Sequence, residues 1–252
     1  MRKYLGLLFL LIFMTGCAVS NAPVTNRTQL ILMSTEQEMA LGEDSYKQAL
    51  NEMEVSKDML QTQRVVNVGQ RIANVANRDD FNWEFALVES KEVNAFCLPG
   101  GKVVVYTGIL SIAEDDDELA TVISHEIGHA IARHGAERMS LGMVTTVVGV
   151  AANIALGRNG NSDTQKMFNI AYGLGATYGV ILPYSRMQEL EADEIGIDLM
   201  FKAGYDIDKA LSFWVKMQNN AGDKKISEFT STHPSENTRI ENIRKVISRY
   251  KN

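Results

Sequence analysis

The motif HEIGH at positions 125–129 constrains this chain more than any other part of its sequence. The preceding residues 118–124 have helical periodicity, so the motif is expected on a helix. Positions four apart on a helix lie about 40° apart around its axis, so His125 and His129 can bind one metal ion. Glu126 then points to the open position of that ion, where it can take a proton from a water molecule. The motif therefore predicts a hydrolytic zinc site, and the alternative is a pair of histidines inside a structural helix.

A zinc site of this kind needs a third protein ligand, and an acidic segment later in the chain supplies the best candidates. Glu189 and Asp193 are four residues apart, so they share one face of a predicted helix, whereas Glu191 is expected to point away from it. We assign Glu189 to the metal. We assign Asp193 to a hydrogen bond from the ring N–H of a histidine ligand, which fixes the tautomer of that ring. The alternative is a solvated acidic helix face.

The order of these residues resembles the HtpX and CAAX-prenyl-protease type of zinc endopeptidase. The matching parts are the motif at 125–129, the pair Glu189 and Asp193, His233-Pro234 with Arg239, and flanking segments at 34–38, 41–42, 93–96, 99–101 and 118–120. Within that family the chain is most similar to short periplasmic lipoprotein members. The resemblance implies one Zn²⁺ per chain, a zincin-like α+β domain and cleavage of peptide bonds.

The resemblance also adds two candidate residues near the end of the chain. It implies that His233 and Arg239 donate hydrogen bonds to the tetrahedral oxyanion. The imidazole of His233 could instead occupy the open metal position in the resting enzyme, as a plug that must swing away before catalysis. We favour the plug, and the remaining alternative is a structural histidine at the start of a helix.

The spacing of apolar residues and the positions of Pro and Gly predict an α+β domain at 34–252, with helices around a small sheet. The predicted helices are 34–53, 61–77, 117–134, 184–202, 206–219 and 234–250, and the predicted strands are 83–89 and 102–107. The strand at 102–107 is expected at the sheet edge nearest the zinc, where a substrate segment could add as an extra strand. Val103, Val104 and Val105 are therefore candidate substrate-binding residues, although they could also serve the core.

The first residues have the pattern of a bacterial lipoprotein signal at 1–16. Two basic residues precede an apolar run at 5–14, and small residues then lead to Cys17. We expect cleavage before Cys17, acylation of this residue and a polar, irregular tether at 17–33. Because Ala18 follows, we expect an outer-membrane lipoprotein that faces the periplasm of a Gram-negative bacterium. An uncleaved membrane anchor is the alternative.

Two charge-free stretches, 139–157 and 167–185, lie between the two predicted metal-binding helices. Each is nearly as long as a membrane span, but Gly, Thr, Asn and Ser are frequent in both. We expect a helical hairpin at 139–185 that packs on the domain or lies at the lipid surface. A hairpin that spans the membrane is the alternative.

The chain is acidic, which argues against a nucleic-acid partner. It has 25 Lys and Arg residues against 31 Asp and Glu residues, and it lacks a basic cluster.

The chain has only two cysteines, Cys17 and Cys97. If Cys17 is lipidated, no internal disulfide can form. We predict an endopeptidase for unfolded or misassembled envelope proteins, working with other envelope proteases or assembly factors. The alternative is a chaperone-like or scaffold lipoprotein that assists outer-membrane protein assembly with residual proteolysis.

Overall fold

The computed structural model describes residues 19–22, 24–143, 186–220, 233 and 237–251. The chain divides into two compact units, one formed by 1–38 and 135–181 and the other by 39–134 and 182–252. The predicted signal peptide, Cys17 and most of the predicted hairpin lie outside the described residues. Among the helices that the structure does describe, none is long and apolar enough to cross a membrane.

The first unit contains a small antiparallel sheet formed by β1 (Val19–Asn21) and β2 (Thr28–Leu30). Arg27 lies next to β2 and donates one hydrogen bond of 2.7 Å to each carboxylate oxygen of Glu137. The tether predicted at 17–33 is therefore not irregular throughout, because part of it is a hydrogen-bonded hairpin.

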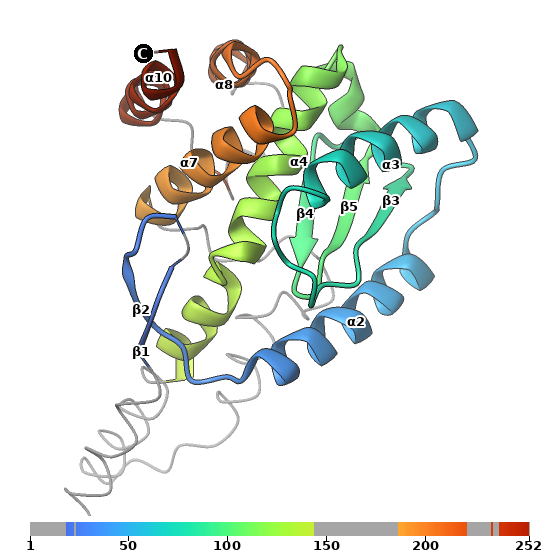
Figure 1. The fold of residues 1–252 in the computed structure, drawn as a ribbon. Helices are drawn as coiled ribbons and strands as arrows, with labels where there is room; N and C mark the ends of the chain where they lie inside the picture. The colour runs from blue at the N-terminus through green and yellow to red at the C-terminus, as the bar shows by residue number, and fades with distance from the viewer. Residues whose placement is uncertain (1–18, 23, 144–185, 221–232, 234–236, 252) are drawn as a thin grey trace, which may run out of the picture. The chain divides into compact units, whose positions relative to one another are not determined.

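The second unit contains a mixed three-stranded sheet and most of the helices (Figure 1). The strands are β3 (Glu84–Val88), β4 (Ala95–Leu98) and β5 (Lys102–Tyr106). The helical elements are α2 (Thr35–Glu52), α3 (Met59–Ala73), the 3-10 turn η1 (Thr107–Ser111), α4 (Asp116–Ile131), α7 (Arg186–Lys202), α8 (Asp208–Asn219) and α10 (Asn237–Lys251). This arrangement confirms the predicted α+β class.

Strand β5 is the central strand of this sheet and not its edge. The order is β3-β5-β4, with β5 parallel to β3 and antiparallel to β4. Val103, Val104 and Val105 are completely buried, because β5 has a hydrogen-bonded neighbour on each side and packed side chains on each face. The predictions that β5 is the edge strand and that these valines bind substrate are therefore wrong. Strand β4, which the sequence did not predict, forms one edge of the sheet.

Alternate valines of β5 contribute to two different cores. Val103 and Val105 belong to the large core formed with α3 and α4, whereas Val104 belongs to a smaller cluster with Tyr46 of α2. This division follows the two-residue period of a strand. The sheet is therefore covered on both faces.

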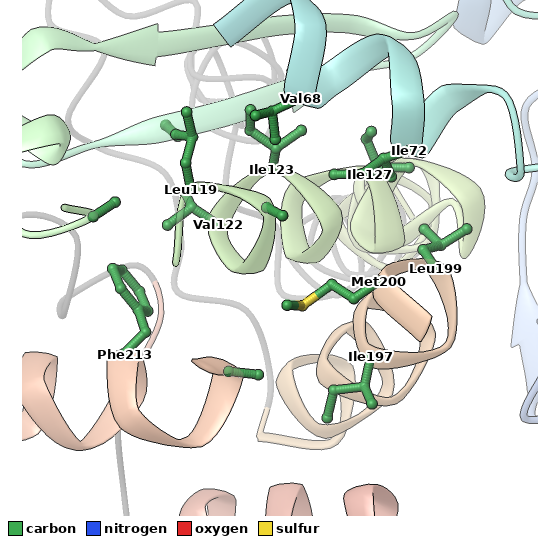
Figure 2. Packing of buried hydrophobic residues seen from close by; sticks show 14 of the residues in the cluster. Val68, Ile72, Leu119, Val122, Ile123, Ile127, Ile197, Leu199, Met200 and Phe213 are labelled. Atoms are coloured by element: carbon green, nitrogen blue, oxygen red, sulfur yellow. The ribbon is translucent and has the colours of Figure 1, made fainter. Parts of the chain in front are cut away.

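Helix α4 runs through the middle of the second unit, between α3 on one side and α7 on the other (Figure 1). Figure 2 shows Ile123 and Ile127 of α4 facing Val68 and Ile72 of α3. Every residue of α4 from position 118 onward is buried. A helix that is buried all round cannot hold charged side chains without partners, so the polar residues of its motif must bind one another or an ion.

Helices α4 and α7 approach each other closely at two glycines. A Cβ atom on Gly128 would lie 2.8 Å from the backbone oxygen of Ala192. A Cβ atom on Gly196 would lie 3.1 Å from the backbone nitrogen of His125. The missing side chains let the two backbones pack together, and this contact places the acidic residues of α7 beside the histidines of α4.

Candidate metal centre

Four donor side chains meet in the interior of the second unit. His125 and His129 come from α4, Glu189 comes from α7, and His233 precedes α10. One ligand atom from each lies within 4.8 Å of all the others, and each of the four residues is no more than 3% exposed. The Nε2 atoms of His125 and His129 are 3.1 Å apart, and Oε1 of Glu189 lies 3.3 Å from Nε2 of His129. The predicted pair of histidines and the predicted third ligand therefore do meet in the fold.

The donor set fits a zinc ion. Zinc favours imidazole nitrogen and carboxylate oxygen in a four-coordinate site, and these are the atoms that converge here. His233 places Nδ1 3.2 Å from Oε1 of Glu189 and 3.3 Å from Nε2 of His125. Within the described residues, no other group of His, Cys, Asp or Glu side chains has the arrangement needed to hold a metal.

Asp193 and Arg239 hold one side of this cluster. Nδ1 of His125 lies 2.9 Å from Oδ1 of Asp193, which is the contact predicted for a partner of a histidine ligand. Arg239 donates hydrogen bonds of 2.6 and 2.7 Å to the two oxygens of Asp193, and its Nη1 lies 2.9 Å from Oε2 of Glu189. The guanidinium also stacks on Trp214, 3.5 Å from the ring centroid. All three guanidinium nitrogens are thus engaged, which favours a positioning role over the predicted oxyanion donor.

Comparison with known proteins now assigns the family. The model of peptidase family M48 matches residues 59–247, which include every donor of the cluster. The chain belongs to peptidase family M48. This membership confirms the predicted metalloendopeptidase. Family M48 is a broader assignment than the HtpX and CAAX-prenyl-protease type that the sequence resembles.

Several curated relatives of this M48 peptidase have informative names. Mitochondrial metalloendopeptidase OMA1 is 34% identical in Schizosaccharomyces pombe, over 88% of this chain and 64% of that protein. In Saccharomyces cerevisiae it is 31% identical, over 97% of this chain and 74% of that protein. The beta-barrel assembly-enhancing protease of Escherichia coli is 29% identical, over 84% of this chain and 44% of that protein. The M48 chain thus spans less than two thirds of the first and third of these proteins.

Burial and neighbouring charges shift the pKa values of carboxyl groups in the M48 site in opposite directions. Burial raises the pKa of Glu126 to about 7. Burial also acts on Asp193, but Arg239 outweighs it and lowers the pKa of this carboxyl group. At Glu189 the charges of His233 and Arg239 outweigh burial, and the pKa lies well below its usual value. Two carboxylates therefore stay ionised while a third can accept a proton, which is the division that a ligand set and a general base require.

Glu126 is placed to handle a proton. Its side chain is buried, and its Oε1 accepts no hydrogen bond from any residue that the structure describes. The same oxygen lies 3.5 Å from Nε2 of His233. A buried carboxylate oxygen without a hydrogen bond is uncommon in a folded protein and is typical of functional sites.

A second set of contacts at the site escaped the sequence analysis. Nδ1 of His134 lies 2.8 Å from Nδ1 of His129, and Nε2 of His134 lies 2.9 Å from Oε2 of Glu191. Glu191 was expected off the helix face that Glu189 and Asp193 share, and its buried carboxylate is joined to a donor of the cluster through one imidazole. The signal available in the sequence was His134 itself, which is one of only four histidines in the chain.

Strand β4 forms the sheet edge beside the M48 site. It contacts α4 directly, and the structure shows no backbone hydrogen bond from β4 to any described segment other than β5. Burial and the negative charge of Glu126 raise the pKa of the Cys97 thiol on this strand well above its usual value. Cys97 is therefore a packing residue and not a thiolate nucleophile. The edge strand expected beside the metal exists, but it is β4.

Proposed function

We propose that this chain is a zinc-dependent endopeptidase in which His125, His129 and Glu189 hold the metal. The observation that carries the proposal is the convergence of these buried donors beside Glu126, whose Oε1 has no hydrogen-bond partner among the described residues. When bound there, zinc supplies a Lewis acid that polarises the scissile carbonyl and acidifies a water molecule.

Glu126 moves the protons of the reaction. It takes a proton from the attacking water and then passes this proton to the leaving amine. Burial raises its pKa, which makes Glu126 a stronger base than an exposed carboxylate. Asp193 and Arg239 keep His125 and Glu189 in place while this transfer occurs, because their buried polar contacts, at 2.9 Å each, fix the orientation of both donors.

The substrate binds along β4 as an added strand. Strand β4 packs against α4, which carries two of the proposed ligands, so an extended peptide paired with residues 95–98 would lie near the metal cluster. Main-chain pairing provides affinity with little demand on sequence. Such an enzyme selects chains that are unfolded or misassembled, because a folded protein does not offer a free extended segment.

His233 lies beside Glu126 in the metal cluster. Its Nε2 faces Oε1 of Glu126 at 3.5 Å, in the space that water or a substrate carbonyl needs. We infer that His233 is a plug in the resting enzyme and must move before the substrate enters. Once it has moved, the same ring can donate a hydrogen bond to the oxyanion.

We further propose that the chain is a lipoprotein of the outer membrane, attached through Cys17 and facing the periplasm. The supporting observations are the lipoprotein signal pattern that ends at Cys17 and the similarity to the beta-barrel assembly-enhancing protease of E. coli. In that location the substrates are unfolded or misassembled envelope proteins, and other envelope proteases or assembly factors are partners. Similarity to the mitochondrial enzymes supports the shared peptidase domain and not the compartment.

Casein cleavage by the purified protein tests the proposed activity. We expect stoichiometric zinc, cleavage that a chelator abolishes and zinc restores, and a Glu126→Gln variant that keeps zinc but loses activity. Glu194→Gln is the matched control, because this acidic residue on α7 faces Arg249 and not the metal cluster. Cleavage by Glu126→Gln at the wild-type rate would disprove the mechanism. A wild-type protein that binds zinc without cleaving casein would favour the chaperone-like or scaffold alternative.

A further inference from the structure

We propose that His134 and Glu191 form a hydrogen-bond relay that positions His129 as a zinc ligand. The relay fixes the tautomer of His129 and strengthens its bond to the metal. This inference rests on the proposed zinc site, and it assigns a role to two buried residues that the proposed chemistry does not use.

The three side chains of the relay form a continuous line. The Nδ1 atoms of His129 and His134 are 2.8 Å apart, and the other nitrogen of His134 lies 2.9 Å from the carboxylate of Glu191. His134 is completely buried, and Glu191 is 4% exposed. Both contacts therefore form away from water, where hydrogen bonds are strong and lost partners are costly.

The backbone changes direction between His129 and His134. On a continuous helix, residues five apart lie about 140° apart around the axis, so these two rings would face nearly opposite ways. Helix α4 instead ends at Ile131, and Arg133 adopts the left-handed conformation with φ of 56°. This conformation costs about 1–2 kcal/mol for a residue other than glycine. Strain of this kind persists where the surrounding structure fixes it, and here it turns His134 back toward the metal cluster.

The protons of the relay can point in only one direction when His129 binds a metal. Nε2 of His129 faces the other donors of the cluster, at 3.3 Å from Oε1 of Glu189. The proton of the neutral His129 ring is therefore on Nδ1, which donates to Nδ1 of His134. That atom must accept, so His134 carries its own proton on Nε2 and donates it to Glu191.

This arrangement gives each proposed ligand a buried charged partner. His125 contacts Asp193 directly, and Glu189 contacts Arg239. His129 reaches the carboxylate of Glu191 through one interposed imidazole. A carboxylate at the end of such a chain orients the ligand ring and increases the basicity of its metal-binding nitrogen.

A purely structural role is the competing explanation. The same contacts join the end of α4 to α7 and would stabilise the fold even if no metal bound. The two roles differ in measurable ways. A structural tie affects the free energy of unfolding of the metal-free protein, whereas the relay affects zinc affinity and the tautomer of His134.

Zinc dissociation constants, measured by competition with a chelator on the whole protein, provide the first test. Glu191→Gln keeps the shape and one acceptor oxygen but removes the charge, and His134→Gln removes the ring. We expect each change to weaken zinc binding about 10- to 100-fold. Glu194→Gln removes a charge from the same helix away from the cluster, so its zinc affinity should equal that of the wild type. Circular dichroism and thermal melts of the metal-free variants check that they fold.

The ¹⁵N NMR spectrum of the zinc-loaded wild type provides the second test. We expect His134 to be neutral, with its proton on Nε2. Folded Glu191→Gln and His134→Gln variants with wild-type zinc affinity would overturn the relay, even if their melting temperatures fall. If neither variant folds, the spectrum decides alone, because a proton on Nδ1 of His134 is incompatible with the relay. A wild-type protein that fails to bind zinc would instead disprove the proposed metal site.

Discussion

Arg239 holds Asp193 in a buried, bidentate ion pair, with hydrogen bonds of 2.6 and 2.7 Å. The same guanidinium reaches Glu189, so one positive charge contacts two buried carboxylates. Both carboxylates also touch histidines of α4. The ion pair thus connects α10 to α7 at the point where the metal cluster is built.

The first prediction concerns the loss of this charge. Arg239→Ala should lower the free energy of unfolding of the metal-free protein by about 3–5 kcal/mol, because it leaves buried carboxylates without a partner. Arg249→Ala is the matched control, since it removes an exposed ion pair from the same helix and should cost less than about 1 kcal/mol. Urea denaturation with chelator present measures both. Equal effects of the two substitutions would contradict the role given to Arg239.

The second prediction concerns the third metal ligand. Glu189→Ala should lose zinc during dialysis, because two histidines alone do not retain it at a site built for three protein ligands. Glu191→Ala should retain zinc at saturating concentration but bind it more weakly than the wild type. Metal analysis before and after dialysis separates the two. Stoichiometric zinc in Glu189→Ala together with no zinc in Glu191→Ala would make Glu191, and not Glu189, the third metal ligand.

The third prediction concerns His233. If the ring is a plug, His233→Ala should cleave casein faster than the wild type or cleave itself, because the space beside Glu126 becomes free. If the ring is mainly an oxyanion donor, kcat should fall while zinc is retained. Unchanged kinetics and an unchanged spectrum of the cobalt-substituted protein would leave only a structural role.

The fourth prediction concerns the metal-free protein and pH. The pKa of Glu126 rises from 4.5 to about 7 in the folded state, so folding favours its protonated form. This contribution to stability is complete below pH 4.5 and is lost as the pH rises through 7. Relative to Glu126→Gln, the wild type should therefore become less stable over this range, by about 1.4 kcal/mol per unit of pKa shift. A difference between the two proteins that does not change with pH, in urea denaturation with chelator, would contradict the burial of this carboxyl group.

The fifth prediction concerns the membrane anchor. Cys17→Ser should leave the protein soluble or as an unprocessed precursor, because the acyl chains cannot be attached. Cell fractionation measures this outcome. An exported version that lacks residues 1–17 and still binds membranes tightly would show that another part of the chain, such as 139–185, holds it there.

Local patterns in the sequence predicted most helices well. Helix α2 was expected at 34–53 and occupies Thr35–Glu52, since Ser34 and Gln37 exchange the hydrogen bonds of a capping box. The end of α4 was predicted too late, at position 134. Its left-handed turn uses Arg133, and arginine gives no signal for such a turn.

Contacts between distant segments were harder to predict. Strand β4 has only four residues without alternation, so no sequence period revealed it. Without β4, the order of the sheet cannot be deduced from the sequence, which then predicts β5 at the edge. The i, i+4 spacing predicted that Glu189 and Asp193 share a helix face, but the side chain of Glu191 reaches the site through His134, which required the tertiary turn after α4.

Because of the glycine contacts between α4 and α7, the geometry of the metal site does not depend on the length of the segment that links the two helices. Because the backbones meet directly at Gly128 and Gly196, their spacing does not depend on how many residues lie between positions 135 and 185. Inserted residues there are therefore compatible with an unchanged arrangement of the metal ligands. One added methyl group at position 128, by contrast, would push Ala192 and the neighbouring Glu189 away from the histidines. The metal site is therefore more sensitive to the smallest substitution at position 128 than to the length of the linking segment.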